Sequence, residues 1–358
     1  MEPMLGYRAA DIETARAAGP QIVAIGGGTG LSTMLRGLKR CSENITAIVT
    51  MADDGGGSGV LRQDLGMLPP GDIRNCILAL ANVEPMMQKL LGYRFTEGSL
   101  NGQSFGNLFL AALGGVYGSF EKAVERMGEL LAVTGRVLPV TTEDIYLEAE
   151  FENGSTVLGE SKISDAKKQQ KCRIQRVRLI PEHPHALQAT LAAIEAADLV
   201  VLGPGSLYTS IIPNLLVEGV ADAVARSRAL RVYVCNVMTQ EGESEGYTAF
   251  DHVRALLMHG RPRLFDVCLC NSAPVSDAMR AQYSEEGAAP TVIDREAFAN
   301  AGIELWERPI LEEKKGVARH DPLGLTYALL ELLHEKRPRE GIYAKIDETI
   351  LNYIRFQV

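Results

Sequence analysis

The sequence is poor in cysteine and in aromatic residues. It has six cysteines in 358 residues, and aromatic residues make up 6% of the chain with a single tryptophan. So few cysteines exclude the disulfide scaffold on which small secreted domains depend. Cys268 and Cys270 alternate along one apolar segment and therefore share a face of a predicted strand. We interpret them as reduced core thiols rather than as metal ligands.

Long apolar runs and an excess of basic residues are also missing. No run of 18 consecutive apolar residues occurs, which argues against a transmembrane helix. The first 19 residues lack the basic start and apolar run of a signal peptide, so we expect a cytoplasmic protein. The net charge of −9 disfavours a general nucleic-acid-binding protein.

The segment 162–178 is a local exception to the acidic balance, because it carries seven basic residues and one aspartate. Two interpretations remain open for it. It forms either the solvated face of a β-arm or a rim that attracts a polyphosphate or a protein partner.

Short apolar runs recur along the chain and are typical of strands buried on both faces. They lie at 21–25, 45–50, 198–203, 230–237 and 264–271. Segments with helical periodicity separate them, so we predict an α/β fold with a Rossmann-like, doubly wound, mostly parallel sheet. We expect a single nucleotide-binding domain over 20–335, an N-terminal extension over 1–19 and a C-terminal tail over 336–358.

Three stretches depart from this rhythm. Residues 52–72 are rich in Gly, Asp and Pro and predict an irregular segment, whereas 73–134 reads as helical. Residues 137–180 alternate apolar and polar residues and predict an antiparallel β insert attached to the main sheet. Asn153 and Gly154 within it are typical of a type I′ turn. Near the end, Asp321 and Pro322 predict the start of a helix.

Glycine-rich or polar segments follow the predicted strands. They are GGGTGLS at 26–32, ADDGGGSG at 52–59, GPGSLYTS at 203–210, MTQEGES at 238–244 and NSAPVS at 271–276. In a parallel sheet these segments meet at the carboxyl edge, where ligands bind. Bare amides at a helix N-terminus favour an anion, and glycine lets a phosphate approach closely. We therefore predict a phosphate or diphosphate site, although the spacing fits neither a dinucleotide fingerprint nor a P-loop.

Candidate polar side chains lie in the same segments. Asp53 and Asp54 could bind ribose hydroxyls or hold Mg²⁺ against a diphosphate, with turn capping as the alternative. Arg62 and Arg74 could contact phosphate oxygens, with surface ion pairs as the alternative. No catalytic triad is readable, so any chemistry would be group transfer by positioning and electrostatics.

Six ordered motifs carry a family resemblance. They are GGGTGLSTMLRGLK, ITAIVTMADDGGGSGVLR, LPPGDIRNCILALAN, SFGN, GPGSLYTSIIPNLL and NVMTQEGES. Together they resemble the YvcK-type gluconeogenesis factors of the CofD-like superfamily, which is named for 2-phospho-L-lactate transferase. The resemblance covers about residues 20 to 335.

The resemblance implies a regulatory protein that binds a UDP-sugar, UDP-N-acetylglucosamine in particular. Such proteins are needed for cell shape and cell-wall synthesis during gluconeogenic growth, and the implied partners are cell-wall synthesis proteins. The alternative is a Mg²⁺-dependent transferase that acts on a nucleoside-diphosphate-linked donor. The segment RQDLGMLPPGDIRN follows the YvcK branch, which disfavours the transferase. A homodimer is a further expectation, because sheets of this type often pair through exposed helices.

The loops and the resemblance together nominate one set of nucleotide-binding residues. They are Gly27, Gly28, Thr29, Gly30, Leu31, Ser32, Asp53, Asp54, Ser58, Arg62, Asn107, Gly203, Gly205, Ser206, Tyr208 and Asn236. Asp53 and Asp54 are also the candidate Mg²⁺ ligands. For Tyr208, a core position is an equal alternative. No catalytic residue is assigned.

Overall fold

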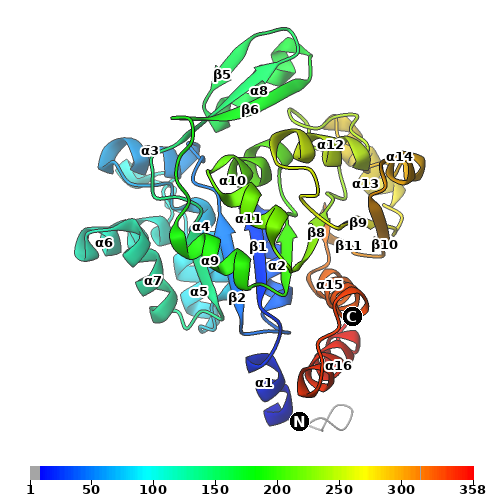
Figure 1. Cartoon of the computed structure of the whole chain (residues 1–358). Coiled ribbons are helices and arrows are strands. Elements are labelled where there is room, and N and C mark those ends of the chain that lie inside the picture. Colours follow the sequence, from blue (N-terminus) through cyan, green and yellow to red (C-terminus); the bar gives the residue numbers. More distant parts are fainter. Residues whose placement is uncertain (1–8, 315) are drawn as a thin grey trace.

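A computed structural model of the chain describes residues 9–314 and 316–358. Its centre is a seven-stranded sheet with the strand order β10-β9-β8-β7-β1-β2-β3 (Figure 1). Every neighbouring pair in this sheet is parallel. The strands are β1 (Ile22–Gly26), β2 (Ile45–Val49), β3 (Arg136–Pro139), β7 (Leu199–Leu202), β8 (Leu230–Val234), β9 (Val267–Asn271) and β10 (Glu304–Arg308). The prediction of a Rossmann-like α/β fold is confirmed.

The central strands form because their sequences are continuous apolar runs. Every residue of β1, β2 and β7 is buried, as expected for parallel strands covered on both faces. The helices around the sheet are α2 (Gly28–Leu38), α3 (Gly56–Leu65), α4 (Gly71–Leu80), α5 (Pro85–Gly92), α6 (Phe105–Tyr117), α7 (Phe120–Leu130), α9 (Gln188–Ala196), α10 (Ile212–Leu216), α11 (Val220–Arg226), α12 (Ala249–His259), α13 (Asp277–Glu285), α14 (Arg295–Ala301) and α15 (Pro322–Lys336).

Segment 52–72 was predicted to be irregular, and this prediction is wrong. Helix α3 forms there despite its glycines, and it ends at Gly66 in the left-handed conformation. Its buried Leu61 and Arg62 anchor it to the rest of the chain. Tertiary packing therefore overrides the low helix propensity of glycine in this segment.

The antiparallel insert is a sheet of its own rather than part of the main sheet. It consists of β4 (Tyr146–Phe151), β5 (Thr156–Leu158) and β6 (Ile174–Ile180) in the order β5-β4-β6. It projects beyond the carboxyl edge of the main sheet (Figure 1). The predicted type I′ turn is wrong, because Gly154 has a positive φ of 81° and Asn153 does not.

The basic segment 162–178 lies in this insert, but its first part is a helix, α8 (Glu160–Gln170), rather than a strand. Its charges meet acidic partners within the chain. Lys168 pairs with Glu241 at 2.7 Å, and Lys167 pairs with Glu245. On β6, two arginines pair with the glutamates opposite them on β4. Much of the basic charge is therefore neutralised internally.

The first and last helices of the described residues, α1 (Ala9–Ala17) and α16 (Ile342–Arg355), lie together below the sheet (Figure 1). Helix α1 contacts α16, which also packs on α15. The first eight residues of the predicted N-terminal extension lie outside the described residues. Asp321 caps α15 through the amides of Leu323 and Gly324, as predicted. Within 9–314 and 316–358, no helix is long and apolar enough to cross a membrane.

Candidate functional site

The first and third glycine-rich loops meet at the carboxyl edge of the sheet. A Cβ on Gly30 would lie 2.6 Å from the Pro204 carbonyl oxygen, and one on Gly205 would lie 3.3 Å from the Gly27 oxygen. Only residues without side chains allow this approach. The convergence of the loop tips that the sequence predicts is therefore present.

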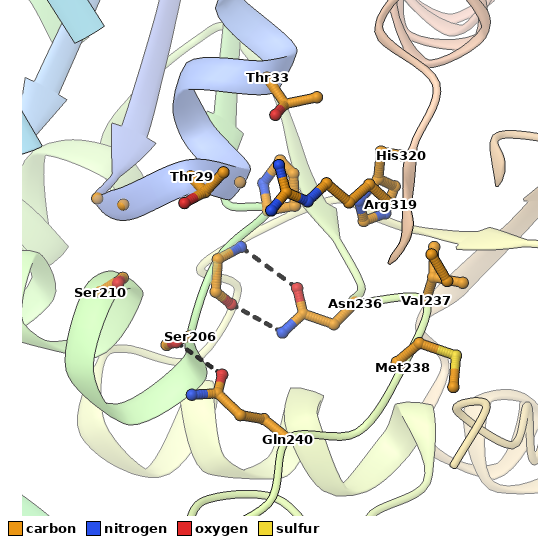
Figure 2. A pocket seen from close by; sticks show the side chains of 16 residues that line it. Thr29, Thr33, Ser206, Ser210, Asn236, Val237, Met238, Gln240, Arg319 and His320 are labelled. Atoms are coloured by element: carbon orange, nitrogen blue, oxygen red, sulfur yellow. Dashed lines mark hydrogen bonds between the residues drawn. The ribbon is translucent and has the colours of Figure 1, made fainter. Parts of the chain in front are cut away.

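The two loops line one side of a cavity of about 250 Å³ (Figure 2). The residues that line it come from the ends of β1, β7 and β8 and from the strand β12 (Val317–His320). They are Gly27, Gly28, Thr29, Gly30, Thr33, Pro204, Gly205, Ser206, Ser210, Asn236, Val237, Met238, Gln240, Ala318, Arg319 and His320. Seven of the sixteen predicted residues line this cavity: Gly27, Gly28, Thr29, Gly30, Gly205, Ser206 and Asn236.

The first loop presents the N-terminus of α2 to the cavity. Gly27 is extended and precedes α2 without a capping side chain, and Gly28 has a φ of +65° that favours glycine. The Gly28 amide donates to the Asp72 carboxylate. The amides of Thr29 and Gly30 belong to the same first turn and have no intrahelical acceptor. They form the part of the site that fits an anion.

The amides of the third loop, at 203–210, are hydrogen-bonded within the chain. The Gly205 amide donates to Asn236 Oδ1 at 3.3 Å, and Asn236 Nδ2 donates to the Gly205 carbonyl at 2.8 Å (Figure 2). The buried Glu243 carboxylate accepts the amides of Tyr208 and Thr209 at 2.8 and 3.1 Å. Glu243 therefore occupies the helix N-terminus that the sequence assigned to a phosphate. The Asn236 side chain therefore holds the backbone of this loop in place through two hydrogen bonds to Gly205.

Charge in the cavity comes from Arg319, which sequence reasoning missed. It is the one Lys or Arg among the described residues that line the cavity, and its side chain extends from β12 toward the start of α2 (Figure 2). His320 stays neutral near pH 7, because burial lowers its pKa to about 4. Its Nε2 donates to the Cys235 carbonyl at 3.1 Å. The hairpin of β11 (Leu311–Lys314) and β12 carries no strong sequence signal, which is why Arg319 was not nominated.

A cluster of carboxylates lies beside the first loop. A Cβ on Gly27 would come within 2.7 Å of Asp72 Oδ2. Burial, and secondarily the charge of Asp53, raises the pKa of Asp72 to about 6. Burial raises the pKa of Glu160 to about 8, with further contributions from Asp53, Asp54 and Asp72. The charges of Asp53, Asp54, Asp72 and Glu160 therefore interact electrostatically. Asp72 and Glu160 were not among the predicted site residues.

The predicted Mg²⁺ ligands are each engaged with the backbone. Asp53 Oδ1 accepts the Gly55 amide at 2.9 Å, and Asp54 Oδ1 accepts the Ser161 amide of α8 at 2.8 Å. Neither lines the cavity of Figure 2. Within the described part of the chain, no group of three or more His, Cys, Asp or Glu residues is arranged to hold a metal ion.

Arg62 and Asn107 lie away from the cavity and hold neighbouring elements together. The Arg62 guanidinium donates to Asp144 and stacks 3.8 Å above the Tyr146 ring at the base of the insert. Asn107 accepts a hydrogen bond of 2.9 Å from Arg74. Both are buried, so they support the site through the elements that they join.

The remaining nominated residues are internal. Leu31 belongs to the core, and the Ser32 hydroxyl donates to the Thr29 carbonyl. Ser58 is buried on α3. Tyr208 is 1% exposed, and its hydroxyl lies 3.0 Å from that of Tyr247, which favours the core alternative. Gly203 turns the chain with a φ of +80°.

Comparison with known proteins agrees with the fold. The family model for 2-phospho-L-lactate transferase CofD matches residues 22–311. The chain belongs to the CofD family. A putative gluconeogenesis factor of Thermoanaerobacterium thermosulfurigenes is 54% identical over 88% of this chain and 97% of that protein. The gluconeogenesis factor of Bacillus subtilis is 46% identical over 88% of this chain and 99% of that protein.

A crystal structure from the same family gives the same result for the fold. It is a UPF0052 family protein of Bacillus halodurans, with 43% identity and a TM-score of 0.82, and it covers 86% of this chain and 99% of that one. The family resemblance stated from the motifs is thereby confirmed.

Proposed function

We propose that this protein is a gluconeogenesis factor that binds a nucleoside-diphosphate sugar, UDP-N-acetylglucosamine in particular, and acts as a regulator of cell-wall synthesis. The observation that carries the proposal is the start of α2, where the amides of Thr29 and Gly30 have no intrahelical acceptor, facing Arg319 across one cavity. Amides at a helix N-terminus and a guanidinium are the donors that phosphate oxygens prefer.

The size and lining of the cavity support a ligand of this class. A volume of about 250 Å³ lies just below the usual range for a whole drug-sized ligand. It suits a diphosphate with part of its neighbouring sugar or nucleoside, while the rest extends beyond it. Hydroxyls of Thr29, Thr33 and Ser210 and the amide of Gln240 are available to a sugar.

The residues that line the cavity support a binding role. Its one histidine is neutral and hydrogen-bonded to the backbone. Among the described residues that line it there is no Asp, Glu, Lys or Cys to act as an acid, base or nucleophile. The cavity therefore supports binding better than covalent or acid–base catalysis.

The second candidate function is a Mg²⁺-dependent transferase, and the carboxylate cluster favours it. Mg²⁺ is often held by one or two carboxylates together with substrate phosphates. Asp53 and Asp72 adjoin the loop that would hold the diphosphate, and their mutual repulsion would be relieved by a cation. A bound Mg²⁺ would neutralise charge on the transferred or departing phosphate.

Calorimetry tests the proposed function directly. Purified protein is titrated with UDP-N-acetylglucosamine, UDP-glucose, GDP and NAD, with and without Mg²⁺. We expect a uridine nucleotide sugar to bind with a dissociation constant well below millimolar. Binding of no uridine nucleotide in that range would contradict the proposal.

Phosphorus NMR of the same mixtures separates the two functions. Under the regulatory proposal, the diphosphate signals stay unchanged over hours. Mg²⁺-dependent breakdown that is lost in Asp53→Asn, and kept in the control Asp64→Asn on the exposed face of α3, would establish the transferase instead.

A further inference from the structure

The main sheet has an open edge at β3, and a groove lies along it. β3 ends the strand order of the sheet, and among the described residues it pairs with β2 alone. All four residues of the strand, 136–139, line the groove, which has a volume of about 430 Å³. Helix α7 contributes further lining residues and α9 contributes Ala189, and both helices lie at this edge of the sheet (Figure 1). We call this cavity the β3 groove; it shares no lining residue with the cavity of Figure 2.

The backbone of β3 offers a hydrogen-bonding position on the side of the groove. The Val140 amide donates to the Val49 carbonyl of β2, and the backbone groups of successive strand residues point alternately to opposite sides. Val137, three residues earlier, therefore directs its amide and its carbonyl away from β2. The edge is closed beyond this position, because Pro139 has no amide and the Val140 carbonyl accepts the Leu187 amide. An added strand can thus pair with β3 at Val137.

The wall that α7 gives the groove is acidic. Glu121, Glu125 and Glu129 line it, and their four-residue spacing places them in one row on the helix. Glu129 pairs with Arg126 at 2.6 Å. Within 9–314 and 316–358, neither Glu121 nor Glu125 has an ion-pair partner. Arg136 is the one Lys or Arg of the described lining, so the groove presents an excess of acidic side chains. Like charges at this spacing repel one another, and a cation bound along the row would relieve that repulsion.

The groove is apolar between this row and the strand. Val124 of α7 is 3% exposed, Val137 of β3 is 6% exposed, and both line the groove. Val133 and Leu138 line it as well and are half-buried. Successive side chains of an extended chain point to opposite sides. A strand in which basic and apolar residues alternate can therefore offer cations to the glutamates and apolar side chains to this surface.

We propose that the β3 groove binds an extended basic segment of a partner protein, which adds to the sheet as a strand at Val137. Its lysine or arginine side chains lie against Glu121 and Glu125, and its backbone hydrogen-bonds to Val137. The net charge of −9 of the whole chain also attracts such a segment. A free polyamine is disfavoured as the occupant, because it has no backbone amide or carbonyl to pair with the strand.

Fluorescence anisotropy with a labelled peptide tests the proposal. The probe is a short peptide in which lysine and valine alternate, and it is titrated with the full chain. We expect saturable binding that weakens as the salt concentration rises, because part of the attraction comes from exposed charges. A control peptide in which glutamate replaces every lysine should not bind.

A double substitution tests the acidic row. Glu121→Gln combined with Glu125→Gln should raise the dissociation constant of the lysine peptide about five- to tenfold, because two charge pairs are lost. Glu296→Gln combined with Glu335→Gln is the matched control, since it removes the same charge from exposed positions outside the groove. The control should stay within about twofold of the parent. Circular dichroism of both variants verifies that the helices are intact.

Amide hydrogen exchange at Val137, followed by NMR, tests the pairing of strands. The bound lysine peptide should slow exchange of this amide about tenfold or more, because the amide then donates to the added strand. A lysine–valine peptide whose backbone amides are all methylated keeps the charges but cannot pair as a strand. It should bind more weakly and leave the exchange of Val137 unchanged.

Three results would overturn the proposal. They are the absence of saturable binding of the lysine peptide to the parent, an unchanged dissociation constant in the Glu121 and Glu125 double variant, and equal binding of the methylated peptide. Equal binding of the methylated peptide, together with its displacement by spermine, would assign the row of glutamates to free polyamines instead.

Discussion

Replacing Arg319 with Gln removes the charged side chain that faces the start of α2. A guanidinium that donates to phosphate contributes about 1.5–3 kcal/mol when the hydrogen bond is charge-assisted. Because Arg319 is exposed, solvent screens the interaction, so we expect a loss of about 1–2 kcal/mol. This corresponds to a dissociation constant for UDP-N-acetylglucosamine raised roughly 5- to 30-fold.

Calorimetry at two salt concentrations measures this effect. The ratio of dissociation constants between Arg319→Gln and the parent should shrink at high salt, because salt screens an exposed charge. Arg228→Gln is the matched control, since it removes the same charge from an exposed position outside the cavity. Equal weakening in both variants would indicate a general charge effect, and no weakening in Arg319→Gln would refute the assigned contact.

Three further predictions concern the loops and the carboxylates. Gly28→Val should abolish nucleotide binding in calorimetry, because it adds a side chain to the lining of the cavity and because the φ of +65° disfavours a β-branched residue and distorts the start of α2; retained affinity would contradict it. Asn236→Ala removes two hydrogen bonds to Gly205 and should lower the free energy of unfolding in urea by about 1–3 kcal/mol, a loss that Asn236→Asp should not fully restore. Glu160 has a pKa raised from 4.5 to about 8, so its contribution to stability is full below pH 4.5 and lost as the pH rises to about 8; Glu160→Gln should therefore raise the melting temperature at pH 8 and not at pH 4, and an equal shift at both would argue against a titrating Glu160.

The parts of the fold that were predictable are those dictated by burial on both faces. The strands β1, β2 and β7 are continuous apolar runs with no competing pattern, so their place in a parallel sheet follows from the sequence. Edge strands carry weaker signals. β3 ends in Pro139, and Trp306 is the one buried residue of β10. Residues 136–139 were thus assigned partly to the insert, and 304–308 were not assigned at all.

The candidate site was predictable where it depends on backbone and not where it depends on long-range partners. Glycine spacing after buried strands indicated the loops that meet at Gly30 and Pro204. It did not indicate that the carboxylate of Glu243, some forty residues further along, would accept the amides of Tyr208 and Thr209 in the third loop. Nor could it reveal Arg319, because the hairpin that carries this residue is placed by tertiary packing alone.

The internal carboxylate of Glu243 has a consequence for how a ligand lies in the cavity. Of the two amide-rich ends at this edge of the sheet, the one at Tyr208 and Thr209 is held by Glu243. At the start of α2 only the Gly28 amide meets an internal carboxylate, that of Asp72, and the amides of Thr29 and Gly30 have no intrahelical acceptor. A molecule that is negatively charged at one end should therefore enter in a single orientation. The difference between the two helix starts thus fixes the direction in which an anionic ligand lies in the cavity.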